Sequence, residues 1–73
     1  MYYLLWHDDA KKTPIADKIA AAIAAFSDRF KVRPALVLVN AGEVVELPGI
    51  KVEIGASVLP GDFWLGPVEG VWL

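Results

Sequence analysis

Two stretches of this chain are apolar without interruption, and they restrict its fold more than any other feature. Residues 2–6 are aromatic and aliphatic throughout, and residues 35–39 form an aliphatic run rich in branched side chains. Short apolar runs of this kind are typical of strands that are covered on both faces. Each run therefore predicts a strand that needs one packing layer above it and another below it.

One helix is predicted between these strands, over residues 14–30. Its bulky apolar side chains share an arc of about 80°; they are Ile15, Ile19, Ile23, Phe26 and Phe30. On the opposite side we expect the charged residues Asp17, Lys18 and Asp28. Thr13 is expected to be the N-cap and Pro14 the first helical residue, and Pro34 ensures that the helix has ended.

Two Pro-Gly pairs in the second half of the chain are typical of tight turns. Each pair predicts a hairpin. The joined segments would be 43–47 with 50–54 around Pro48-Gly49, and 58–59 with 63–65 around Pro60-Gly61. Gly66-Pro67 then breaks the strand pattern, so we expect residues 66–73 to dock or fray as a tail.

The resulting order is β-α-β-β-β, which predicts an α+β fold with an α/β start. We expect a mixed sheet of about four or five strands with one helix on one face. The first two strands should be parallel and joined by a right-handed crossover; if they are also neighbours, their carboxyl ends meet at one edge. A chain of 73 residues has room for a single domain, residues 1–73.

The second face of this sheet has no cover within the predicted fold. The chain is 56% hydrophobic, and with no cysteine and one histidine it lacks a disulfide or a Cys/His zinc site to stabilise a small core. We therefore expect a homo-oligomer, most simply a dimer, or a protein partner on that face. The expected interface residues are Tyr3, Leu5, Val37, Val39, Phe63, Trp64 and Trp72.

Polar residues gather where the first strand ends and the helix begins. They are His7, Asp8, Asp9, Lys12 and Thr13, and Asn40 follows the second strand. Ligands of open α/β sheets bind at the carboxyl ends of strands. Such a cluster could hold a hard cation, or an anion with the help of Lys11 and the helix N-terminus. The simpler interpretation is a solvated loop, because adjacent strand residues point to opposite faces.

Composition excludes several classes of protein. Seven Lys and Arg against nine Asp and Glu leave a formal net charge of -2, whereas nucleic-acid binders usually carry a basic excess. No segment approaches the roughly 18–20 apolar residues of a membrane span, and the first residues lack the basic region of a signal peptide. We expect a cytoplasmic protein that binds neither nucleic acid nor membrane.

The sequence offers no context for catalysis. Ser27 and Ser57 do not stand in a nucleophile elbow, and no glycine precedes Gly42 that could form a phosphate-binding loop. We therefore expect a non-enzymatic domain without a cofactor, acting through self-association or protein–protein interaction, with a ligand-binding module as the alternative. Gln and Cys are absent and Asn40 is the single asparagine, which favours a thermophilic source.

Four segments together resemble a group of short bacterial proteins. They are Leu5-Trp6-His7-Asp8-Asp9, Lys18-Ile19-Ala20-Ala21-Ala22-Ile23, Leu36-Val37-Leu38-Val39-Asn40 and Pro60-Gly61-Asp62-Phe63-Trp64-Leu65-Gly66. The resemblance covers most of the chain, and Pro-x-x-Phe-Trp-x-Gly is its most distinctive part. No activity is attached to the group, so the resemblance implies no site residues.

Overall fold

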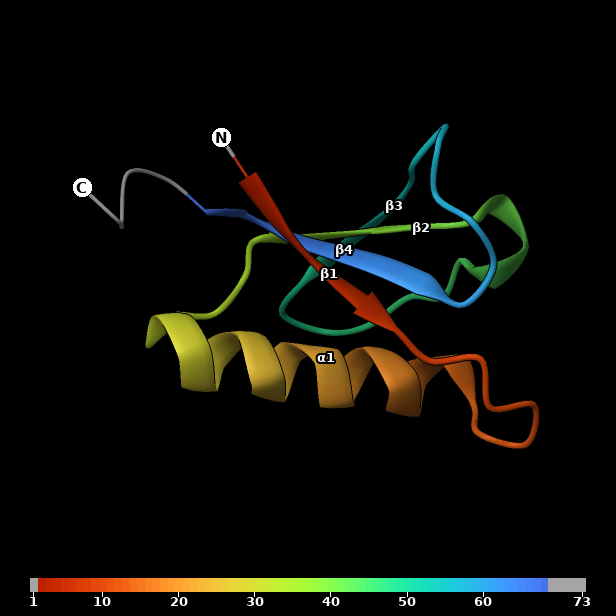
Figure 1. Ribbon diagram of the computed structural model, residues 1–73, viewed down its shortest axis with the longest axis horizontal. Helices are drawn as coiled ribbons and strands as arrows, with labels where there is room; N and C mark the ends of the chain where they lie inside the picture. The colour runs from red at the N-terminus through yellow and green to blue at the C-terminus, as the bar shows by residue number, and fades with distance from the viewer. Residues whose placement is uncertain (1, 69–73) are drawn as a thin grey trace.

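The computed structural model describes residues 2–68 and contains one helix packed on a four-stranded sheet (Figure 1). The elements are β1 Tyr2–His7, α1 Ile15–Phe30, β2 Leu36–Val39, the short 3-10 helix η1 Ala41–Glu43, β3 Lys51–Ile54 and β4 Asp62–Val68. The predicted α+β class, the strand–helix–strand–strand–strand order and the mixed sheet are confirmed.

Helix α1 packs on the sheet through the predicted apolar stripe. Ile19 and Phe26 are fully buried with Ala22, and the remaining stripe residues are half-buried at the margin of the core. The helix start differs from the prediction: Pro14 is the N-cap, and no side chain caps the helix. The placement of Lys18 on the solvent side was also wrong, because only 5% of this residue is exposed.

The strand order is β1-β4-β2-β3, so β1 and β2 are not neighbours. β4 lies between them and is antiparallel to both, so β1 and β2 are parallel to each other and are separated by β4. The predicted parallel orientation of the first two strands is therefore confirmed, whereas they are not neighbours. β4 has a strand on each side, and its Phe63 and Leu65 have no exposed surface.

Neither predicted hairpin forms. β3 pairs with β2 in parallel, and residues 43–47 contain no strand. The Pro-Gly turns exist, with Gly49 at φ 80° and Gly61 at φ 85°, a region that glycine adopts without strain. Each Pro-Gly turn bends the chain before a strand, but the segments on its two sides do not pair with each other. A turn is determined by neighbouring residues, which do not determine the strand with which the following segment pairs.

β4 also extends further than the sequence pattern predicts. The strand continues through Gly66 and Pro67 to Val68 and pairs with β1 as far as Tyr2. The first three residues of the predicted tail therefore belong to the sheet. Residues 69–73, including Trp72, lie outside the described part of the chain.

The two faces of the sheet have different surroundings. Val37, Val39, Phe63 and Leu65 lie beneath α1 and are fully buried. On the opposite side, hereafter the open face, strand register and alternation place Tyr3, Leu5, Leu36, Leu38 and Trp64. In Figure 1 the connection from β3 to β4 rises on this side, away from α1. Its Val58 is buried at the β2 end of the face.

β1 was predicted to be covered on both faces, and this is wrong. It is an edge strand, and Leu5 on the open face is 58% exposed. The prediction took a continuous apolar run for a central strand, whereas β1 has one strand neighbour and one packed face.

Candidate functional site

His7 stands between two carboxylates at the end of β1. The β1–β4 register places it opposite Asp62, and His7 Nδ1 lies 2.6 Å from Asp62 Oδ1. Its other nitrogen, Nε2, lies 3.7 Å from Asp9 Oδ2. Sequence reasoning missed Asp62, because the partner comes from a strand that was not expected beside β1.

These carboxylates favour the protonated imidazole. The hydrogen bond to Asp62 raises the pKa of His7 above its ordinary value of 6.5, and the charges of Asp62 and Asp9 act in the same direction. His7 is 60% exposed and Asp9 is 85% exposed. The arrangement is therefore a solvated charge cluster whose protonation can change with the pH of the surroundings.

The other polar residues predicted at this edge serve local structure. Asp8 accepts a hydrogen bond from the Ala10 N–H at 3.0 Å, which shapes the loop after β1. Asn40 Nδ2 donates to the Val58 carbonyl at 3.1 Å, and its Oδ1 accepts from the Gly42 N–H at 3.0 Å. Both ends of the Asn40 amide are thus engaged, and Asn40 does not join His7 because β4 separates β1 from β2.

No metal centre is found in the described part of the chain. Within residues 2–68, no group of three or more His, Asp or Glu side chains is placed to hold a metal ion. The cation-binding alternative for the His7–Thr13 cluster therefore gains no geometric support from this region.

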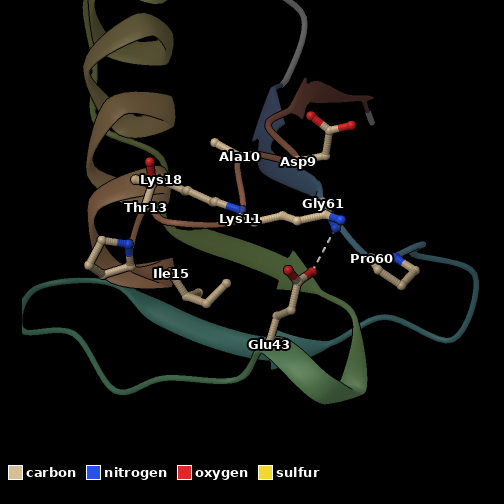
Figure 2. A pocket seen from close by; sticks show the side chains of 10 residues that line it. Asp9, Ala10, Lys11, Thr13, Ile15, Lys18, Glu43, Pro60 and Gly61 are labelled. Atoms are coloured by element: carbon tan, nitrogen blue, oxygen red, sulfur yellow. Dashed lines mark hydrogen bonds between the residues drawn. The ribbon is translucent and has the colours of Figure 1, made fainter.

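A pocket of about 420 Å³ opens beside this edge, between the loop after β1, the start of α1, the end of η1 and the loop before β4. Pockets that bind small molecules usually measure about 300–1,000 Å³. Figure 2 shows side chains from several segments converging on it. Its lining residues are Asp9, Ala10, Lys11, Thr13, Pro14, Ile15, Lys18, Glu43, Pro60 and Gly61.

Two of the predicted ligand-binding residues, Asp9 and Thr13, line this pocket, whereas His7, Asp8, Lys12 and Asn40 do not. Lys12 is exposed and Thr13 is half-buried. The pocket also contains Lys18 and Glu43, which the sequence reasoning did not assign to it. Glu43 Oε1 accepts a hydrogen bond from the Gly61 N–H at 2.8 Å and so closes one wall (Figure 2).

Lys18 could have been recognised from helical spacing. It precedes the buried Ala22 by four residues, and residues four apart lie on the same side of a helix. The charge of the side chain suggested solvent instead. A lysine on the packed side of a helix is the signal that would have pointed to this pocket.

The residues predicted to form an interface divide into two groups. Tyr3, Leu5 and Trp64 lie on the open face, where the Tyr3 and Trp64 rings stand 6.4 Å apart between centroids. Val37, Val39 and Phe63 were predicted at the interface, but they lie on the other face of the sheet, beneath α1. All three are fully buried and have no surface to offer a partner. Trp72 lies outside the described residues.

Comparison with protein families, with curated proteins and with solved structures finds no match for this chain. Within residues 2–68, α1 lacks the length and apolar character needed to cross a membrane.

Proposed function

We propose that this protein acts through self-association, with the open face of the sheet packed against the same face of a second copy. The observation that carries the proposal is the uncovered aromatic and aliphatic surface of this face. Leu5 is 58% exposed at its edge, and Tyr3 and Trp64 are half-buried beside it. Aromatic side chains of this kind are enriched in the buried centres of interfaces.

The charges around the open face favour a second copy as the occupant. Lys51 Nζ lies 3.0 Å from Glu53 Oε2 on β3, and His7 is paired with Asp62 at the end of β1. Each cation thus has its own anion on the same surface. Two identical faces can approach without net repulsion, which is what a two-fold interface requires of a single patch.

The geometry of β1 supports the same proposal. β1 is an edge strand that contains no lysine and no proline, whereas the opposite edge strand β3 carries Lys51 and Glu53. Charges on an edge strand protect it from pairing with other chains. Leu5 belongs to this unprotected edge strand, so the edge borders the open face at a largely exposed apolar side chain.

The experiment is light scattering coupled to size exclusion at micromolar concentrations. We expect about twice the monomer mass of 7.9 kDa. Leu5→Glu should give a monomer with an unchanged circular dichroism spectrum, because Leu5 is largely exposed in the single copy. Val32→Glu is the control, since Val32 is 61% exposed and follows α1, away from the open face. A wild-type protein that remains monomeric at about 100 μM would overturn the proposal.

A further inference from the structure

The pocket at the start of α1 contains a buried lysine that has no partner. Only 5% of Lys18 is exposed, and its side chain takes part in no hydrogen bond or ion pair within residues 2–68. The side chain runs from α1 into the pocket toward Lys11 (Figure 2). Its aliphatic part is buried, and the ammonium group at its end faces the pocket without an acceptor from the described residues.

The position of Lys18 within the helix adds to this demand for an anion. It is the fourth residue of α1, near the end where the helix dipole is positive. Cations are favoured at the other end of a helix, so the dipole and the ammonium group repel each other here. An anion beside Lys18 relieves this repulsion and supplies the partner that the ammonium group lacks.

The helix start also has N–H groups without an acceptor, and Ile15, which carries one of them, lines the pocket. The N–H groups of Asp17 and Lys18 donate to the Pro14 carbonyl, which leaves those of Ile15 and Ala16 as the first-turn donors without an acceptor in the helix. No side chain caps these groups. Free N–H groups at a helix start, aided by the dipole, are a recurrent way to hold phosphate.

The carboxylates on the pocket wall are directed to other partners. Glu43 Oε1 accepts from the Gly61 N–H, and Asp9 Oδ2 lies 3.7 Å from His7 Nε2. Within residues 2–68, neither carboxylate lies within 4.0 Å of a lysine ammonium group. The lysines that form ion pairs in this region are Lys31 and Lys51. The ammonium groups of Lys11 and Lys18 are thus left for a ligand.

We propose that this pocket binds a phosphate group, held by Lys18, Lys11 and the first turn of α1. The carboxylates of Asp9 and Glu43 in the same lining face His7 and the Gly61 N–H, so the two ammonium groups and the helix start are the groups left to hold a phosphate. The volume of about 420 Å³ leaves space for a small organic residue attached to the phosphate. The site lies on the α1 side of the sheet and does not depend on self-association through the open face.

The test is a titration with inorganic phosphate at constant ionic strength, followed by amide NMR and thermal unfolding. We expect saturable shifts at Ile15 and Ala16 and a melting temperature that rises with phosphate concentration. Lys18→Met should weaken phosphate binding at least ten-fold, and Lys11→Met should weaken it less. Lys12→Met is the matched control, because Lys12 neighbours Lys11 but lies outside the pocket, and its affinity should change by less than about two-fold.

The same variant tests whether Lys18 is held for a ligand rather than for the fold. Without phosphate, Lys18→Met should melt at or above the wild-type temperature, because the ammonium group has no partner to lose and methionine keeps a long apolar side chain in the same place. With phosphate, the wild type alone should gain stability. Unchanged phosphate affinity in Lys18→Met would overturn the proposal. So would amide shifts confined to the exposed basic residues at the other end of α1, which are Arg29, Lys31 and Arg33.

Two further probes identify the source of the phosphate group. Glycerol 2-phosphate tests a phosphate ester, and acetate tests a simple carboxylate. Tighter binding of the ester than of inorganic phosphate assigns the site to a small phosphorylated molecule, and weaker binding assigns it to free phosphate. Acetate binding as tight as phosphate binding contradicts the choice of ligand.

Discussion

His7 is the single histidine of the chain, so its titration can be followed without ambiguity. Its ring is held by Asp62 from the neighbouring strand and, more loosely, by Asp9 from the following loop. The stronger partner is the one that lies far away in sequence. A prediction about charge at this position therefore tests the strand pairing as well as the electrostatics.

We predict that NMR titration of the His7 imidazole gives a pKa above 6.5, because the Asp62 hydrogen bond favours the charged ring. Since the folded state binds the proton more tightly, the resulting stabilisation is complete below pH 6.5 and is lost as pH rises through the folded-state pKa. Asp62→Asn should return the pKa toward 6.5, and Asp9→Asn should lower it less. A larger effect of Asp9→Asn would contradict this geometry.

At the residue scale, two of the six residues that the sequence offered as ligand-binding candidates, Asp9 and Thr13, line the pocket. Lys18, which also lines it, was predicted on the wrong side of α1. The spacing to Ala22 was visible in the sequence, but residue type was given more weight than position. Asp62 could not be found, because its proximity to His7 depends on a pairing between residues 55 apart.

At the scale of elements, β4 contributes most to the core. Leu65 is fully buried between β1 and β2, opposite Leu4 on one side and Val37 on the other. Ile19, Ala22 and Phe26 of α1 complete the same cluster. Stability therefore depends on a strand that the local pattern predicted to be a short hairpin arm.

We predict that Leu65→Ala lowers the free energy of unfolding by about 2–5 kcal/mol, from lost apolar burial and the cavity left behind. Leu59→Ala makes the same chemical change at a position that is 65% exposed, and should cost less than about 0.5 kcal/mol. Urea denaturation of both variants checks the pair. Equal losses would show that β4 is not central to the core.

The identity of the elements was more predictable than their arrangement. The apolar stripe of α1 and the two apolar strands follow from local periodicity, which is fixed by neighbouring residues. Strand order is not local: β4 lies between β1 and β2, and its pairing with β1 joins residues that are far apart in the sequence. The Pro-Gly turns were predicted correctly as turns, but a turn does not determine which strand becomes its neighbour.

At the scale of the whole molecule, the sheet has one face beneath α1 and one apolar face that no helix within residues 2–68 covers. The sequence predicted this imbalance from two continuous apolar runs and a single helix. The sequence could not assign side chains to the two faces, because the strand register places Val37 beneath α1 and Leu38 on the open face. The proposed self-association depends on the side chains that this register places on the open face.

If the open face pairs with a second copy, stability must depend on protein concentration. We predict that a hundred-fold increase in concentration raises the wild-type melting temperature by about 5 °C or more, because folding is then linked to association. Leu5→Glu should melt at one temperature throughout that range. Differential scanning calorimetry at two concentrations measures both, and a wild type insensitive to concentration would contradict the linkage.

The central position of β4 also determines when this protein can fold during its synthesis. Among the described strands, β1 is made first, and β4, which pairs with it, is made last. Within residues 2–68, β1 therefore has no strand neighbour until residues 62–68 have been made. A ribosome that stalls before residue 62 leaves apolar side chains of β1 and α1 exposed to aggregation.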